Sequence, residues 1–389
     1  MSRLIVFLLI VGLLAACGQP GSTALPTATS SVPTQPIPTV LAPTQPAPTG
    51  TPIGQLAKAP FVRIAVRAPD DSIQIVNTQV PVDPRPVQIT TGFWQQAGVV
   101  SGTVYALDRT QPRVVAMDKD GTRPLDFIQN PYGLAVLSGD QPRLGWAILH
   151  NGQSAPSKLL VSATDGSQLT TLLTDTTPIT APHLWMAQRW SRDGQSLYFS
   201  TEPDGMGGYI LFGGASSLYR VNVNDRSVQE MMPFDVNGGK LICIDELSSD
   251  ERLIADHCAQ TSIAIKDLSS GQTTTIQPPA DVTGFNFVGS ARFSPDLTRV
   301  AFALAKGDPD NEQGWVALSD SLSGSSKLIV TGKPGRYFTV AGWLNADTLL
   351  LQSNSLTCNP TCTNSLWVVK VDGSGLTHIT DGTFLVMME

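Results

Sequence analysis

The chain has 389 residues with 34 Gly, 29 Pro and a hydrophobic content of 41%, which is high enough to exclude a chain that is disordered throughout. Only 15% of its residues are charged, acidic residues outnumber basic ones by 32 to 25, and the formal net charge is −7. Since no run of Lys or Arg supplies a basic surface, the composition argues against a protein that binds nucleic acid.

The N-terminus has the features of an export signal. Residues 1–3 carry one positive charge, and residues 4–14 form an apolar run that is too short to span a bilayer and is typical of a signal-peptide core. The run ends in Leu14-Ala15-Ala16-Cys17-Gly18, which resembles the lipobox of bacterial lipoproteins.

This resemblance implies that residues 1–16 are a signal peptide and that the thiol of Cys17 carries a diacylglyceryl group. Two or three acyl chains together give stable anchoring. We therefore expect an extracytoplasmic protein that is lipid-anchored to the cell membrane, or to the outer membrane in a cell that has two. The alternative is an ordinary cleavage that leaves a free thiol.

A stalk follows the lipobox. Residues 18–54 contain nine Pro and eight Thr and no charged side chain. Such a segment cannot bury enough apolar surface to offset its ordering entropy, and its prolines favour extended polyproline II. We expect residues 17–58, the lipidated cysteine included, to form a disordered tether, and residues 59–389 to form the folded domain.

The folded domain repeats a pattern of short strands. The unit RWSRDGQSLYFS at residues 189–200 recurs at residues 246–256, 291–303 and 342–352, and each copy predicts a hairpin that turns at polar residues. A third strand follows each hairpin, and fourth strands follow at residues 167–173, 272–278 and 375–380. The third strands are predicted at residues 73–77, 113–117, 159–163, 218–222, 262–266, 315–319 and 366–370.

Four strands in each repeat of 41 to 60 residues are typical of the blades of a β-propeller. The motifs FSPD…VAF at residues 293–302 and LWVVKVDGSGLTHITDG at residues 366–382 resemble the TolB-type, or PD40, propeller repeat, which is similar to WD40. The seven third strands predict an all-β fold of seven four-stranded blades, with six or eight left open. Because residues 61–90 have room for only three strands, we expect the last strand, residues 383–388, to complete the first blade and close the ring.

Aromatic residues and turn acids that recur within the repeat are expected to have structural roles. Trp190, Phe293 and Trp343 recur in register, which indicates packing between blades. The turn acids Asp193, Asp250 and Asp296 are expected to accept hydrogen bonds from the backbone of their own turns. The four histidines are expected to have structural or solvated roles; they are His150, His183, His257 and His378.

The long connection at residues 201–217 is the candidate partner-binding loop. It carries an apolar run between glycines, which we expect to be exposed, and an exposed apolar patch on a loop of a rigid scaffold is typical of a binding surface. The run consists of Tyr209, Ile210, Leu211 and Phe212. The alternative is a loop that folds over its own blade.

Four cysteines lie in the folded domain. Cys243 and Cys258 face each other across the hairpin that turns near Asp250, which brings them within reach of a disulfide. An even number of cysteines in an exported chain favours a second disulfide, between Cys358 and Cys362, although other pairings remain open. No second half completes a metal-ligand spacing around Cys358 and Cys362.

The sequence offers little sign of catalysis. It contains no C-x-x-C, H-E-x-x-H, G-x-G-x-x-G or Walker A motif, and none of its Gly-x-Ser trios continues to a nucleophile elbow, so we expect neither catalytic residues nor a cofactor. We expect no hydrolase domain of the prolyl-oligopeptidase type, because the propeller takes up the folded domain. Asp308, Asp310 and Glu312 alternate as calcium ligands can, but Gln313 replaces the glycine of an EF-hand, which favours a solvated acidic loop over a metal site.

The predicted function is a monomeric protein-binding or scaffold module of the cell envelope, since the TolB-type resemblance implies an envelope protein as partner. The α/β domain that precedes the propeller in TolB is replaced here by the stalk, so TolB's own partners are not implied. One alternative is a lipoprotein that binds a glycan or a peptide. The other is an enzyme similar to lactonases or glycosidases, with its site in the central funnel and with Asp245, Glu246 and the acids of residues 308–312 as first candidates.

Overall fold

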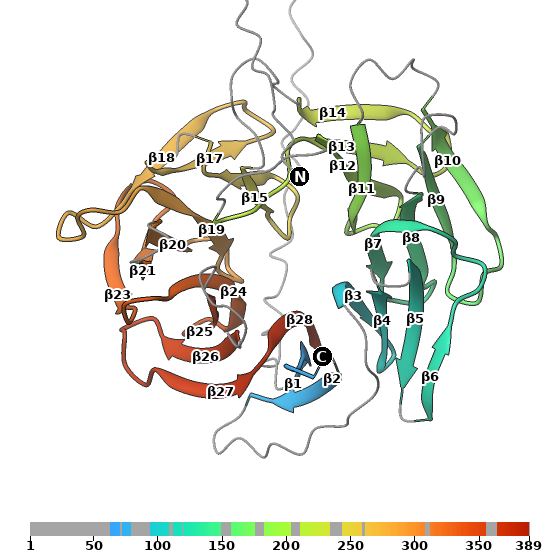
Figure 1. The fold of residues 1–389 in the computed structure, drawn as a ribbon. Helices are drawn as coiled ribbons and strands as arrows, with labels where there is room; N and C mark the ends of the chain where they lie inside the picture. Colours follow the sequence, from blue (N-terminus) through green and yellow to red (C-terminus); the bar gives the residue numbers. More distant parts are fainter. Residues whose placement is uncertain are drawn as a thin grey trace, which may run out of the picture. The chain divides into compact units, whose positions relative to one another are not determined.

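The computed structural model describes residues 63–70, 72–78, 94–108, 112–118, 120–148, 157–175, 183–203, 211–233, 243–258, 261–307, 312–354 and 364–388. Every helix or strand within these ranges is a β-strand. The described part of the chain accordingly contains no helix long and apolar enough to cross a membrane. The strands form seven sheets, which are arranged as the blades of a β-propeller (Figure 1).

The blades follow the chain order, and each is described from its innermost strand outward. Blade 1 contains β28 (Thr383–Met388), β1 (Arg63–Arg67) and β2 (Ile73–Asn77). Blade 2 contains β3 (Trp94–Val100), β4 (Thr103–Asp108), β5 (Arg113–Asp118) and β6 (Gly121–Pro124). Blade 3 contains β7 (Pro131–Leu137), β8 (Arg143–Ile148), β9 (Lys158–Ala163) and β10 (Thr170–Thr174). Blade 4 contains β11 (His183–Trp190), β12 (Ser196–Pro203), β13 (Leu218–Asn222) and β14 (Val228–Met232).

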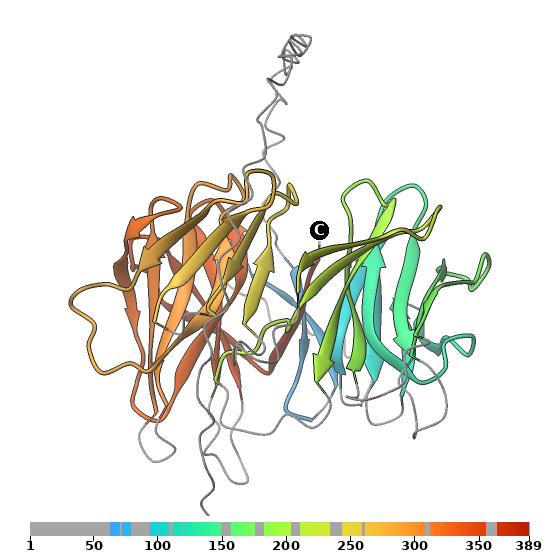
Figure 2. The same ribbon diagram turned by 90° about the horizontal axis from the view of Figure 1, so that it is seen from above.

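The remaining blades have the same antiparallel order. Blade 5 contains β15 (Ile244–Leu247), β16 (Leu253–Asp256), β17 (Ile263–Asp267) and β18 (Thr273–Gln277), with the short β22 (Gly324–Ser325) added in parallel at its outer edge. Blade 6 contains β19 (Phe287–Phe293), β20 (Val300–Lys306), β21 (Gln313–Ser319) and β23 (Lys327–Thr331). Blade 7 contains β24 (Tyr337–Asn345), β25 (Thr348–Asn354), β26 (Ser365–Lys370) and β27 (Thr377–Asp381). Figure 2 shows the blades from the side, with the connections gathered at the two ends of the strands.

The seven blades confirm the number predicted from the repeat. The predicted third strands coincide with β2, β5, β9, β13, β17, β21 and β26. The chain's last strand, β28, pairs antiparallel with β1, with Arg63 opposite Met388 and Arg67 opposite Thr383. The expectation that the last strand enters the first blade is therefore confirmed.

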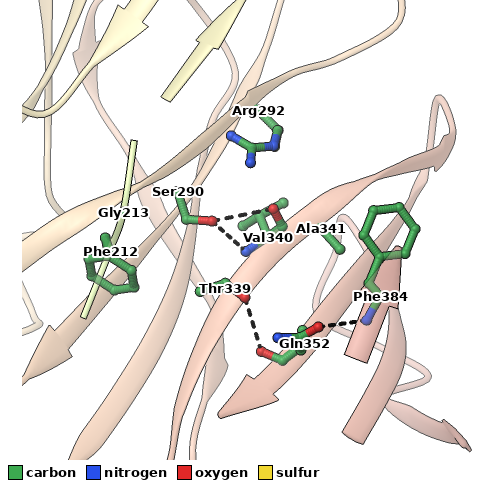
Figure 3. A pocket seen from close by; sticks show the side chains of 9 residues that line it. All are labelled: Phe212, Gly213, Ser290, Arg292, Thr339, Val340, Ala341, Gln352 and Phe384. Carbon is green, nitrogen blue, oxygen red and sulfur yellow. Dashed lines mark hydrogen bonds between the residues drawn. The ribbon is translucent and has the colours of Figure 1, made fainter. Parts of the chain in front are cut away.

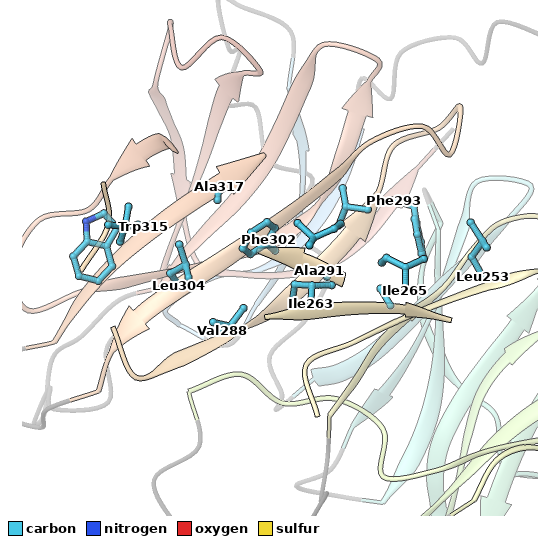
Figure 4. Close-up of a cluster of buried hydrophobic side chains, with 14 residues drawn as sticks. Leu253, Ile263, Ile265, Val288, Ala291, Phe293, Phe302, Leu304, Trp315 and Ala317 are labelled. Atoms are coloured by element: carbon cyan, nitrogen blue, oxygen red, sulfur yellow. The ribbon is translucent and has the colours of Figure 1, made fainter. Parts of the chain in front are cut away.

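Hydrophobic side chains fill the space between consecutive blades. Seven clusters of buried residues lie at the seven blade junctions, one at each. Figure 4 shows the junction of blades 5 and 6, where Ile263 and Ile265 of β17 pack with Phe293 of β19 and Phe302 of β20. The burial of apolar surface between sheets, at roughly 25 cal/mol per Å², therefore holds the ring together.

The recurring aromatic residues pack between blades as predicted. The indole N–H of Trp190 in blade 4 donates to the carbonyl of Ala135 in blade 3, at 3.3 Å. In the same way, the indole N–H of Trp343 in blade 7 donates to the carbonyl of Arg292 in blade 6, at 3.1 Å. Phe293 occupies the corresponding place between blades 5 and 6.

The innermost strand of every blade shifts its register by one residue, as a β-bulge does. A bulge leaves one residue without an opposite partner, bends the strand and redirects its side chains. In β15 the extra residue is Asp245, whereas β24 shifts twice and has two extra residues, Ala341 and Leu344. In β19 the shift falls between Gly289 and Arg292, where Ser290 has a positive φ of 56°. These bulges lie on the strands that line the centre of the ring, and the outermost strands β10, β14, β23 and β27 shift their register as well.

Candidate functional site

A cavity of about 240 Å³ lies among the innermost strands of blades 6, 7 and 1. Strands β19, β24, β25 and β28 supply most of its walls, and a segment that follows β12 supplies the rest (Figure 3). The lining residues are Phe212, Gly213, Ser290, Arg292, Thr339, Val340, Ala341, Gln352 and Phe384. In the view of Figure 3, Phe212 and Phe384 stand on opposite sides, with Arg292 at one end of the cavity.

Ser290 joins three blades at the edge of this cavity. Its backbone N–H donates to Oδ1 of Asp245 in blade 5, at 2.8 Å. Its hydroxyl accepts a hydrogen bond from the backbone N–H of Val340 in blade 7, at 3.0 Å, and lies 3.3 Å from the carbonyl of the same residue. The bulge in β19 therefore places a polar residue where it fixes the neighbouring inner strands.

Arg292 provides the positive charge of the cavity. Its Nη1 donates to the carbonyl oxygens of Asp245 and Ala291, each at 2.8 Å. The hydrogen bonds and ion pairs of the described residues leave its Nε and Nη2 without a partner. One edge of the half-buried guanidinium is thus held by backbone, and the other edge, which can bind a carboxylate through two parallel hydrogen bonds, is open.

Gln352 forms the polar wall opposite Arg292. Its Oε1 accepts a hydrogen bond from the backbone N–H of Phe384, at 2.8 Å, and its Nε2 donates to Oδ1 of Asn354, at 2.5 Å. Asn354 in turn donates through Nδ2 to the hydroxyl of Thr339, at 3.1 Å. The amide of Gln352 is therefore fixed in one orientation, and it holds β28 against β25.

The acids that the sequence suggested for a funnel enzyme hold blades together. The Asp245 side chain is 0% exposed, and its Oδ2 lies 3.0 Å from Nδ1 of His257. Glu246 accepts a hydrogen bond from the backbone N–H of Phe293, at 2.6 Å. Burial raises the pKa of Glu246, and the nearby charge of Arg292 opposes this shift only in part. Neither carboxylate lines the cavity.

A disulfide fixes the hairpin that carries these acids. Cys243 and Cys258 are joined, with 5.0 Å between their Cα atoms, which confirms the pairing predicted from the hairpin. The bond links the start of β15 to the end of β16, next to His257. Cys17, Cys358 and Cys362 lie outside the described residues, so the lipidation and the second disulfide stay predictions.

The candidate partner-binding loop follows a different path from the one expected. Leu211 and Phe212 are 4% and 3% exposed, so the expectation that they form an exposed patch is wrong. The ring of Phe212 meets Tyr337 edge-on, with 5.9 Å between centroids, and Ala215 pairs with Ile244 in blade 5. Tyr209 and Ile210 lie outside the described residues.

The described residues 211–215 of this segment therefore lie over blades 5 to 7. A Cβ atom at Gly289 would lie 2.7 Å from Cβ of Phe212, so only glycine lets the segment approach β19 this closely. The apolar run in the sequence correctly marked a segment of interest. The sequence did not indicate that Gly289, in a distant strand, makes room for this run.

The other sequence candidates are distributed over the domain. Among the residues that the structure describes, no group of three or more His, Cys, Asp or Glu side chains could hold a metal ion. Asp308 and Asp310 are outside the described ranges, whereas Glu312 is 0% exposed, so the expectation of a solvated loop is wrong for this residue. His378 lies on β27, where Nε2 is 3.0 Å from Oδ1 of Asp381. His150 and the side chain of His183 are not described.

Comparisons with known proteins bear on the fold. No protein-family model matches the chain, and no curated protein does either. Among solved structures, a prolyl endopeptidase aligns with a TM-score of 0.53 and 10% identity, over 84% of this chain and 51% of that one. TolB from Acinetobacter baumannii aligns with a TM-score of 0.42 and 14% identity, over 70% of this chain and 64% of TolB. A post-proline cleaving enzyme from Rickettsia typhi aligns with a TM-score of 0.46 and 11% identity, over 84% of this chain and 54% of the enzyme.

The chain thus spans about half the length of the prolyl endopeptidase and less than two thirds of TolB. At 10% identity, the likeness to the endopeptidase shows a shared fold alone.

Proposed function

We propose that the chain is a lipid-anchored, extracytoplasmic β-propeller that binds a protein partner of the cell envelope at the cavity between blades 6, 7 and 1. The cavity carries the proposal, because a preformed pocket with a few fixed polar groups is the usual form of a binding site. The resemblance of the repeat to TolB-type propellers favours a protein as the partner.

Two features support the location. The lipobox at residues 14–18 and the Pro/Thr-rich stalk after it are typical of a tethered lipoprotein. The Cys243–Cys258 disulfide fits an oxidising compartment, since disulfides persist outside the cytoplasm and are rare within it.

Site-specific crosslinking in cells tests this function. A photoreactive p-benzoylphenylalanine in place of Gly213, which lines the cavity and where an added Cβ atom would have no neighbour within 4 Å, is expected to capture one envelope protein. The same group at Leu169, which is 49% exposed on blade 3, is the matched control and should not capture that protein. Capture of the same proteins at both positions, or at neither, contradicts the proposal and favours a small ligand.

Fractionation tests the anchor separately. The wild-type protein is expected in the membrane fraction. The variant Cys17→Ala lacks the thiol that would be acylated, so it should move from the membrane fraction to the soluble fraction. If the variant stays with the membrane to the same extent, the lipid anchor is refuted.

A further inference from the structure

We infer that the cavity binds the C-terminal residue of a polypeptide, with the terminal carboxylate on Arg292 and the last side chain between Phe212 and Phe384. This inference rests on the proposed function and specifies the chemical group that the partner would present.

Among the described residues Arg292 forms no ion pair, although its charge acts on the buried carboxyl of Glu246. Arg189 offers a comparison, because it precedes Trp190 as Arg292 precedes Phe293. Both arginines donate through Nη1 to carbonyl oxygens of blade 5. However, Nη2 of Arg189 also lies 3.8 Å from a carboxylate oxygen of Glu251, whereas no ion pair is described for Arg292.

The carboxylates near Arg292 are engaged elsewhere. Both oxygens of Asp245 have partners, His257 and the backbone of Ser290. The carboxyl group of Glu246 accepts a hydrogen bond from the backbone N–H of Phe293; burial raises its pKa, and the charge of Arg292 opposes this shift. Because Nε and Nη2 of the half-buried guanidinium have no hydrogen-bond partner among the described residues, an anionic ligand would form charge-assisted hydrogen bonds there. The open edge of the guanidinium, Nε and Nη2, suits a carboxylate.

The size of the cavity limits what this carboxylate can belong to. At about 240 Å³ it is smaller than the roughly 300–1,000 Å³ of sites that enclose a drug-sized molecule, so it accommodates the end of a larger ligand. Its sides are apolar at Phe212, Val340 and Phe384. The last residue of a polypeptide carries a carboxylate and a side chain on one carbon atom, which places a charged and an apolar group side by side. Capture of a terminal carboxylate is an established mode of peptide recognition.

The walls are fixed before any ligand enters. Ser290 holds Val340 through two contacts, and Gln352 holds the backbone of Phe384. The aromatic ring of Phe212 is held by Tyr337. A site whose residues already have their binding positions loses little conformational entropy when the ligand binds.

Peptide binding to the purified full-length lipoprotein in detergent tests the inference. The probe is a fluorescein-labelled peptide of Gly and Ser that ends in Phe with a free carboxylate, and its partner is the same peptide with a C-terminal amide. We expect the free acid to bind at least ten-fold more tightly than the amide, as measured by fluorescence anisotropy. Equal affinities would overturn the inference.

Two variants test whether Arg292 causes the preference for the free acid over the amide. Arg292→Gln keeps a polar side chain but loses the charge and the open edge of the guanidinium, so the acid and the amide should bind equally. Arg189→Gln, at the same position of the repeat, is the matched control and should keep the ten-fold preference. If Arg292→Gln keeps the preference, the inference is wrong. If Arg292→Gln does not fold, a second variant, Ala341→Leu, places a larger side chain in the wall of the cavity and should abolish binding of the free acid. Unchanged binding to this variant would likewise refute the site.

A small carboxylic acid distinguishes the source of the carboxylate. N-acetylphenylalanine is expected to bind more weakly than the peptide, and equal affinity would overturn the assignment to a polypeptide. The outcome is independent of the crosslinking in cells. Peptide binding without a captured envelope protein refutes the proposed function alone, whereas a captured protein without preference for the free acid refutes this inference alone.

Discussion

At the scale of single residues, one serine and one aspartate organise the turn in three of the four repeated hairpins; in the fourth, Asn345 accepts the backbone N–H of Asp347. The hydroxyls of Ser191, Ser248 and Ser294 each donate to the aspartate two residues later, at 2.6 Å. Each hydroxyl also accepts the backbone N–H of the residue five positions on, at 2.8 to 3.0 Å. The predicted role of the aspartates is confirmed, since each also accepts a backbone N–H two residues later, and the serines complete the network.

Removing one of these buried hydroxyls should destabilise the domain. Ser248→Ala leaves the N–H of Leu253 and the carboxylate of Asp250 without their hydroxyl partner. A buried donor without an acceptor costs about 1–3 kcal/mol, so the free energy of unfolding should fall by that amount. Urea denaturation followed by circular dichroism measures it. The control is Ser270→Ala in an exposed turn, which should change the free energy by less than about 0.5 kcal/mol; an equal loss in both variants would contradict the role of Ser248.

A second set of aspartates makes the stability depend on acid pH. Asp165, Asp225, Asp267 and Asp372 each accept hydrogen bonds from the hydroxyl and the backbone N–H of a serine two residues later, and these bonds lower the pKa of each carboxyl. The bonds bring the pKa of Asp267 to about 2, from 3.8. Because the folded-state pKa is the lower one, the stability from these bonds is complete above 3.8 and is lost as pH falls toward 2.

The melting temperature should therefore fall between about pH 4 and pH 2, and Asp267→Asn should reduce the steepness of this fall. Thermal unfolding across this pH range measures both effects. Asp281→Asn, at an exposed turn residue, is the control and should follow the wild-type curve. A fall of the same steepness in all three proteins would show that the stability lost with acid comes from other groups.

At the scale of elements, the strands were predictable and the bulges were not. The sequence placed β28 at residues 383–388, because an isolated apolar strand after the last repeat needs a partner. The register shift at Asp245 or Ala341 involves one residue, and one residue leaves no sign in an alternating pattern of such short strands. The cavity depends on these shifts and on the path of Phe212, so the sequence did not predict it.

The disulfide in blade 5 should contribute measurably to stability. Cys243 and Cys258 are 15 residues apart, and a crosslink that closes a loop of this length stabilises by about 3 kcal/mol in the chain-entropy account. Cys243→Ala combined with Cys258→Ala should lower the free energy of unfolding by about that amount. Denaturation with and without reductant measures it. Because reductant could also act on other cysteines, the double variant serves as the control for the effect of reductant. If reductant lowers the free energy of unfolding of the wild-type protein no more than that of the double variant, the disulfide does not contribute to stability.

At the scale of the whole domain, closure depends on seven apolar junctions of unequal size. Among the described residues, the junction of blades 4 and 5 has the smallest cluster, with five buried side chains, and polar contacts supplement it. The hydroxyl of Tyr198 donates to Glu251 at 3.0 Å, and Nη1 of Arg189 donates to the carbonyl of Leu247 at 2.9 Å. The closure of blade 1 depends on the far end of the chain, because its innermost strand is β28, which pairs with β1.

A chain that ends at Gly382 should consequently fail to form a closed ring. The deletion removes β28, exposes the hydrogen-bonding edge of β1 and uncovers Ile64 and Val66, which are fully buried. A buried aliphatic side chain contributes about 1.5–3 kcal/mol, so losing the contacts of a whole strand approaches the roughly 5–15 kcal/mol that stabilise a folded protein. We expect aggregation on size-exclusion chromatography and no cooperative transition by circular dichroism, because exposed strand edges pair with other chains. Deletion of Glu389 alone is the matched control and should leave a monomeric, cooperatively unfolding protein; a cooperative monomer after the longer deletion would mean that the ring is stable without β28.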